Sequence, residues 1–157
     1  MNEWSKKLNF KFTSRFVEVV YRFDLIYTDS EQLKIDFSHY PHPKVERASK
    51  KYKTFDVDSL LDIATNKLHT VNQRTEIKDF VDLYFLLHDD HFTIWDLFNS
   101  AEYKFRQMVF DRYLTAQDLL KVEDFAVLPK MIKPLTLKEL KNFFRDLAQK
   151  LARTSVE

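Results

Sequence analysis

Three charged side chains, Lys67, Asp79 and Asp82, stand in two stretches whose other residues are mostly apolar. If the second stretch is helical, Asp79 and Asp82 are three residues apart and neighbours on its surface. A charge beside apolar side chains needs an oppositely charged partner, access to water, or a place facing a cleft. A lysine and two carboxylates in this arrangement form either a polar active site or a structural network of ion pairs that joins two helices. The residue types alone leave both interpretations open.

The first of the two stretches has the pattern of an amphipathic helix that begins after Ser59. Asp62 follows Ser59 by three residues, an arrangement typical of a helix N-terminus. Apolar residues then recur at spacings of four, four and three, which places them on one face: Leu60, Ala64, Leu68 and Val71. On a helical wheel Lys67 lies about 20° from Leu60, so it belongs to this apolar face.

The second stretch, from Ile77 to Leu87, has almost no polar side and therefore predicts a buried helix. A short break near Gln73 to Thr75 separates it from the first helix. The cations available to pair with its two aspartates are Lys67, Arg74 and Lys78.

Alternating apolar and polar residues predict β-strands in the first part of the chain. The longest pattern covers Phe16 to Tyr27, and a second covers Leu33 to Phe37. The polar segment Thr28 to Gln32 predicts a turn, so the two strands should pair as an antiparallel hairpin. Asp36 projects from the polar face of this hairpin, where periodicity alone predicts a solvated acid.

The remainder of the chain is predicted to be helical. The expected fold is α+β: a small, mostly antiparallel sheet followed by a bundle of about five helices. We expect a single domain over residues 1–157, with the sheet part in residues 1–57 and the helical part in residues 58–157.

The chain contains no glycine and no cysteine. Without glycine it has no P-loop, no dinucleotide-binding fingerprint and no nucleophile elbow. Without cysteine it has no disulfides and no cysteine nucleophile, which is compatible with the cytoplasm. The formal net charge of +1 predicts no strong overall attraction to nucleic acid or anionic membranes. No segment approaches the ~20 apolar residues of a membrane span, so we expect a cytoplasmic protein without membrane partners.

A polar segment, His88 to His91, follows the second helix. A histidine next to an aspartate also occurs in metal-dependent phosphohydrolases, which makes this class an alternative. The spacing of the other histidines does not support it. A polar helix end, where histidine interacts favourably with the helix dipole, is the preferred interpretation.

Two parts of the sequence also resemble a known family. The run L-L-D-I-A-T-N-K-L is followed by K-D-F-V-D-L-Y-F-L-L and preceded, at Leu33 to Pro43, by L-K-I-D-F-S-H-Y-P-H-P. In order, spacing and residue type these runs resemble the AbiEii/AbiGii-type toxin nucleotidyltransferases, bacterial proteins with a polymerase-β-like nucleotidyltransferase fold. The resemblance covers Leu33 to Leu87, the C-terminal portion of that fold. It implies transfer of a nucleotide from a nucleoside triphosphate, with Mg²⁺, to RNA or another acceptor, in a toxin–antitoxin or abortive-infection system.

The resemblance also implies roles for individual residues. Asp36 matches the third carboxylate of the metal site, which holds Mg²⁺ or deprotonates the attacking hydroxyl. Lys67 matches a helical lysine near the nucleotide phosphates, and phosphoryl-type transfer depends mainly on positioning and charge neutralisation. The implied catalytic residues are Asp36, Lys67, Asp79 and Asp82, and the implied nucleotide-binding residues are Lys67, Arg74 and Lys78.

One part of the family pattern is not found. The fold normally starts catalysis with a Gly-Gly or Gly-Ser turn and a D-x-D or D-x-E pair on the next strand, and this has no counterpart between Met1 and Leu33. We therefore expect a truncated family member that is inactive alone. The alternative is a non-catalytic interaction module that binds an antitoxin-like partner or the missing N-terminal half, or that homodimerises through exposed apolar sheet surface.

Overall fold

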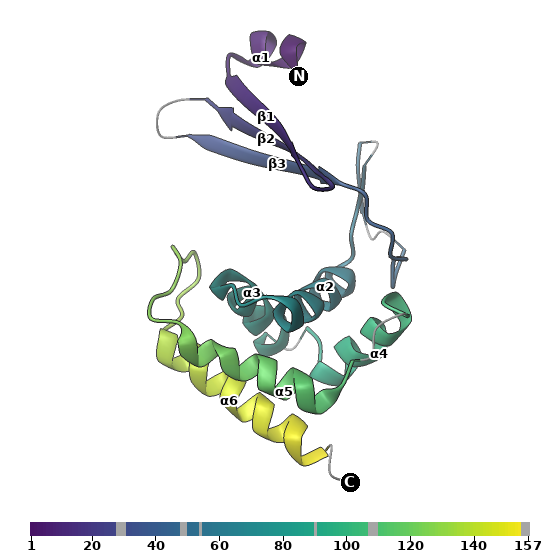
Figure 1. Cartoon of the computed structure of the whole chain (residues 1–157), viewed down its shortest axis with the longest axis vertical. Helices are drawn as coiled ribbons and strands as arrows, with labels where there is room; N and C mark the ends of the chain where they lie inside the picture. Colours follow the sequence, from purple (N-terminus) through teal and green to yellow (C-terminus); the bar gives the residue numbers. More distant parts are fainter. Residues whose placement is uncertain (28–30, 48–49, 54, 90, 107–109, 155–157) are drawn as a thin grey trace. The chain divides into compact units, whose positions relative to one another are not determined.

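The computed structural model describes residues 1–27, 31–47, 50–53, 55–89, 91–106 and 110–154. The chain forms two compact units, Met1–Pro41 and His42–Glu157 (Figure 1). The first unit contains a short helix and an antiparallel sheet, and the second contains a small β-hairpin and a bundle of helices. The predicted α+β fold is therefore confirmed.

The first unit begins with helix α1 (Asn2–Leu8), which is followed by strands β1 (Lys11–Val17), β2 (Val20–Ile26) and β3 (Gln32–Ser38). The strands are antiparallel and lie in the order β1-β2-β3. Residues directly opposite each other on paired strands share one face of a sheet. The register therefore gathers an apolar face from Phe12, Phe16, Tyr21, Phe23, Leu25, Leu33, Ile35 and Phe37. The other face is largely polar and includes Asp36.

The long strand predicted over Phe16 to Tyr27 is wrong, because the chain turns within it at Glu18 and Val19. Glu18 adopts a left-handed conformation with φ of 54°. Residues other than Gly, Asn and Asp rarely adopt this conformation, so nothing in the sequence marked the turn. Of the turn predicted at Thr28 to Gln32, residues 28–30 lie outside the described residues.

The second unit begins with an antiparallel hairpin of β4 (Lys50–Tyr52) and β5 (Phe55–Val57). The helices that follow are α2 (Leu60–Gln73), α3 (Ile77–His88), α4 (Ile94–Lys104), α5 (Arg112–Leu120), the 3₁₀ helix η1 (Lys121–Asp124) and α6 (Leu137–Thr154). The two central helices and the break between them are as predicted. Ser59 caps α2, since its hydroxyl accepts a hydrogen bond from the Asp62 N–H at 3.0 Å.

The core of the second unit lies between the helices. Helix α2 packs against α3, α4 and α5, while α6 packs against α3 and α5 (Figure 1). Large side chains from five helices are fully buried there, namely Leu68, Phe80, Leu97, Leu119 and Phe144. This packing fixes α2 and α3 against each other, and thereby fixes the charged side chains that project between them.

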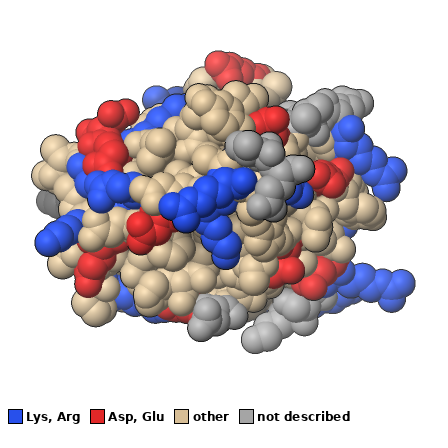
Figure 2. All heavy atoms as spheres, turned by 90° about the horizontal axis from the view of Figure 1, so that it is seen from below, with Lys and Arg blue, Asp and Glu red and all other residues tan. Residues whose placement is uncertain are grey.

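Basic and acidic side chains are interspersed over the face of the molecule that Figure 2 shows. This distribution agrees with the small net charge of +1. Among the described residues, no helix is both long enough and apolar enough to cross a bilayer.

Candidate functional site

The facing sides of α2 and α3 bring four of the predicted residues together. Lys67 projects from α2, Arg74 is the residue at which that helix ends, and Asp79 lies in the first turn of α3. Asp82 follows Asp79 by three residues and so lies beside it on the helix. Because the break between the helices is short, the end of α2 lies close to the start of α3, where the positive end of the helix dipole also favours a carboxylate.

Lys67 lies between the two aspartates of this charged cluster, which consists of Lys67, Arg74, Asp79 and Asp82. Its Nζ is 2.9 Å from Oδ1 of Asp79 and 2.6 Å from Oδ2 of Asp82. Arg74 occupies the second oxygen of Asp79, with Nε and a terminal nitrogen each 2.9 Å from Oδ2. Both oxygens of Asp79 are thus bound by cations.

The four side chains differ in their access to solvent. The Asp79 side chain is 1% exposed, whereas those of Lys67, Asp82 and Arg74 are 25%, 51% and 55% exposed. A buried carboxylate therefore anchors two cations whose side chains remain partly exposed to solvent. Of the two carboxylates that contact Lys67, Asp82 is the easier one to displace from it, because water already solvates much of the Asp82 side chain.

The electrostatics keep Lys67 and Asp79 ionised. Burial by itself raises the pKa of Asp79, but hydrogen bonds from Lys67 and Arg74 outweigh it and hold the pKa below its ordinary value. Burial likewise lowers the pKa of Lys67, and the hydrogen bonds to Asp82 and Asp79 more than compensate, so its pKa is raised. Lys67 is consequently a fixed positive charge at neutral pH and not a proton acceptor. Its chemical capacity is to neutralise an anionic ligand.

Asp36 belongs to the other unit, on β3, and is bound by an arginine. Arg22 on β2 donates hydrogen bonds from Nε to Oδ1 at 2.7 Å and from a terminal nitrogen to Oδ2 at 2.9 Å. The hydrogen bonds from Arg22 hold the pKa of Asp36 below its ordinary value. Within the described ranges, no three histidine, cysteine or acidic residues lie together as metal ligands do. With both Asp36 oxygens engaged, these side chains as they stand do not fit a Mg²⁺ site.

The histidine–aspartate segment has a structural explanation. The His88 ring stacks on Tyr84 with centroids 4.8 Å apart, and its Nδ1 is 3.4 Å from Oδ1 of Asp89. Lys133 binds the other Asp89 oxygen at 2.8 Å. Asp90 lies outside the described residues. The described side chains thus pair with protein groups, and nothing in their arrangement favours a phosphohydrolase.

A D-x-D triplet is present elsewhere in the chain, outside the range Met1 to Leu33 in which the family motif has no counterpart. Asp56 is the middle residue of β5 and Asp58 follows that strand directly, with no glycine turn before them. Asp58 pairs with Lys44 at 3.1 Å. Asp56 lines a cavity of about 600 Å³ together with Lys44 and Arg47. The triplet therefore faces basic side chains of the neighbouring loop.

A second ion pair, which is fully buried, was not predicted from the sequence. Asp62 accepts a hydrogen bond from Nζ of Lys104 at 2.6 Å, and the two side chains are 0% and 1% exposed. The same carboxylate accepts the N–H groups of Val45 at 2.9 Å and Glu46 at 3.2 Å, and the hydroxyl of Ser59 at 3.0 Å. Asp62 therefore ties the loop before β4 to the start of α2. A usable signal was Lys104 itself, which continues the apolar stripe of α4.

Comparison with known proteins identifies the family. The family model described as "Nucleotidyl transferase AbiEii toxin, Type IV TA system" matches residues 4–155, nearly the whole chain. No curated protein and no solved structure matches significantly. The match confirms the resemblance seen over Leu33 to Leu87 and extends it to both sides. The chain therefore belongs to the AbiEii family of nucleotidyl transferase toxins.

Proposed function

We propose that the charged cluster on α2 and α3 is the phosphate-holding part of a nucleotidyltransferase-like toxin. The observation that carries this proposal is the position of Lys67, whose side chain is 25% exposed while its ammonium group is held by the buried Asp79. Asp79 fixes Lys67 and Arg74 in place, and a triphosphate would take the position of the exposed Asp82 at Lys67. Transfer of phosphoryl-type groups depends largely on such fixed positive charges.

A purely structural network makes a different prediction for the same residues. In that case the cluster only joins α2 to α3, and its cations bind no ligand. What supports the functional interpretation is that the buried Asp79 holds Lys67 and Arg74 in fixed positions while both side chains remain partly exposed to solvent. The family of the chain points in the same direction, since its members are described as nucleotidyl transferases.

The test is nucleotide binding by a matched pair of variants. Lys67→Ala should weaken the binding of nucleoside triphosphates, measured by isothermal titration calorimetry, by about tenfold or more. Lys141→Ala is the control, because Lys141 is similarly exposed at 22% and also pairs with an acid, Glu123. Equal affinities in the wild type and both variants would refute the role of Lys67.

We further propose that the chain alone does not transfer nucleotides. The support is the lack of any glycine, and hence of the glycine-containing turn that precedes the paired carboxylates in this fold. Incubation with labelled nucleoside triphosphates, Mg²⁺ and total RNA should leave both the RNA and the protein unlabelled. Label that depends on Lys67 would contradict this part of the proposal while supporting nucleotide binding.

The second candidate function is an interaction module, and the apolar face of the first unit favours it. Phe16, Phe37 and Leu33, which lie on this face, are 68%, 56% and 48% exposed. An exposed patch of this kind is typical of a protein–protein contact, with an antitoxin or with a second copy as the candidate partner. Self-association in light scattering that Phe16→Ser abolishes would support it, and a monomer at all concentrations would exclude the homodimer.

A further inference from the structure

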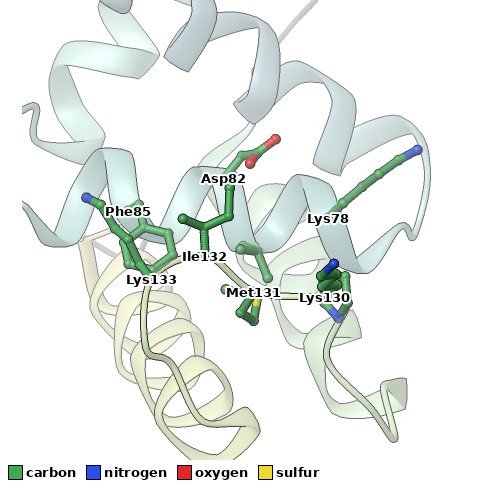
Figure 3. A pocket seen from close by; sticks show the side chains of 9 residues that line it. Lys78, Asp82, Phe85, Lys130, Met131, Ile132 and Lys133 are labelled. Carbon is green, nitrogen blue, oxygen red and sulfur yellow. The ribbon is translucent and has the colours of Figure 1, made fainter. Parts of the chain in front are cut away.

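A groove runs along α3 next to the charged cluster. It has a volume of about 360 Å³ and lies between α3 and the connector that leads to α6 (Figure 3). Its walls are Lys78, Val81, Asp82 and Phe85 from α3 and residues 129–133 of the connector. The volume is in the range of small-molecule sites. Asp82 links this groove to the cluster, because its other contact is Lys67 at 2.6 Å.

The groove is apolar in its middle and positively charged at one end. Met131 and Ile132 lie in the middle, with Lys78 and Lys130 at one end and Phe85 and Lys133 at the other (Figure 3). This polarity suits a ligand with a flat apolar body and an anionic end.

The charges at the two ends are not equivalent. Lys133 is already neutralised by Asp89 at 2.8 Å, and its Nζ lies 5.0 Å above the Phe85 ring. Asp82 is neutralised by Lys67. In the described part of the chain, Lys78 and Lys130 have no acidic partner. The uncompensated positive charge therefore lies at the end of the groove that adjoins the start of α3, where Asp79 and Lys67 meet.

We propose that this groove binds the nucleoside part of the nucleotide. The base and sugar lie on Val81, Phe85 and Ile132, and the phosphates extend past Lys78 and Lys130 toward Lys67. Lys78 and Phe85 are seven residues apart on α3, about 10 Å along the helix, which leaves room for a nucleoside between them. The proposal rests on the proposed function and specifies where its substrate lies.

Two connector residues provide a test with a built-in control. Ile132 lines the groove and is fully exposed at 102%, whereas Val127 is 75% exposed on the same connector but does not line it. Neither side chain supports the core, so Ile132→Ser and Val127→Ser should both fold. Circular dichroism and thermal melting of each variant confirm this before binding is measured.

The binding experiment titrates the whole chain with ATP, CTP, GTP and UTP, and separately with inorganic tripolyphosphate, which has no nucleoside. We expect the preferred nucleotide to bind more tightly than tripolyphosphate. Ile132→Ser should weaken nucleotide binding by about fivefold or more and leave the affinity for tripolyphosphate unchanged. Val127→Ser should change neither. Lys130→Glu should weaken both ligands, and Lys138→Glu on α6 is its control.

The possible failures are distinguishable. If Lys67→Ala abolishes nucleotide binding while Ile132→Ser and Lys130→Glu bind normally, the groove proposal is overturned and the proposed function stands. Equal losses of nucleotide affinity in Ile132→Ser and Val127→Ser also overturn the groove proposal, because Val127 does not line the groove. If the wild type binds no nucleoside triphosphate, both proposals are overturned.

Discussion

Replacement of Lys104 by methionine should destabilise the second unit strongly. Methionine keeps much of the length and apolar volume of the lysine side chain but removes its charge. The variant removes the ammonium group of Lys104 that pairs with the Asp62 carboxylate, which is 0% exposed. The N–H groups of Val45 and Glu46 and the Ser59 hydroxyl still donate to it. The perturbation is thus a buried charge that keeps its hydrogen bonds but loses its ion pair.

The size of the effect follows from this environment. Removal of one partner from a buried ion pair typically costs 3–5 kcal/mol, because the remaining charge is desolvated and uncompensated. The three remaining donors to Asp62 place the expected loss near the lower limit, at about 3 kcal/mol. That is a large part of the total stability of a domain, which is about 5–15 kcal/mol.

Urea denaturation followed by circular dichroism measures this loss, and a second variant tests its cause. A protein that already carries Asp62→Asn has no buried carboxylate charge. In that protein, Lys104→Met should lower the free energy of unfolding by at least about 1 kcal/mol less than it does in the wild type. Lys121→Met is the surface control, because Lys121 is 39% exposed and pairs with Asp118. It should cost about 0.5 kcal/mol or less. A cost below about 1 kcal/mol for Lys104→Met, or the same cost in both backgrounds, would refute the reasoning.

Two further predictions concern Asp79 and the turn at Glu18. The pKa of Asp79 is lowered on folding, so its contribution to stability is present above the ordinary carboxyl pKa of about 3.9 and is lost as the pH falls through the folded value. Asp79→Asn should therefore cost about 2 kcal/mol at pH 7 in denaturant melts, and a cost that does not shrink below about pH 4 would contradict this. Glu18 has φ of 54°, so Glu18→Gly should stabilise the first unit by about 1 kcal/mol while Glu18→Ala should not. Equal melting temperatures for the two Glu18 variants would show that the turn stores no strain.

The charged cluster could be predicted from the sequence because all of its signals are local. The helical period placed Lys67 on an apolar face, and Asp79 and Asp82 interrupt an otherwise apolar helix. Charges in such positions need partners, and the shortness of the break between α2 and α3 limits which partners are available. Arg74 lies in that break and contacts Asp79 as its sequence position suggested.

Features that depend on distant residues or unusual backbone conformations were not predictable in the same way. Asp62 and Lys104 are 42 residues apart, and only their burial reveals them as partners. The sequence around Asp62 indicated a helix cap, which accounts for its contacts with Ser59 but not for its ion pair with Lys104. The turn at Glu18 was hidden because no Gly, Asn or Asp marks it. In each case the preference of the individual residue was overridden by its tertiary surroundings.

The most direct test of the central claim is a crystal structure of the chain with a bound nucleoside triphosphate. We expect a phosphate oxygen about 2.7–2.9 Å from Nζ of Lys67, with Asp82 displaced and the contact between Lys67 and Asp79 retained. A triphosphate bound elsewhere, with Lys67 still held between Asp79 and Asp82, would contradict it and leave the cluster as a structural joint between α2 and α3.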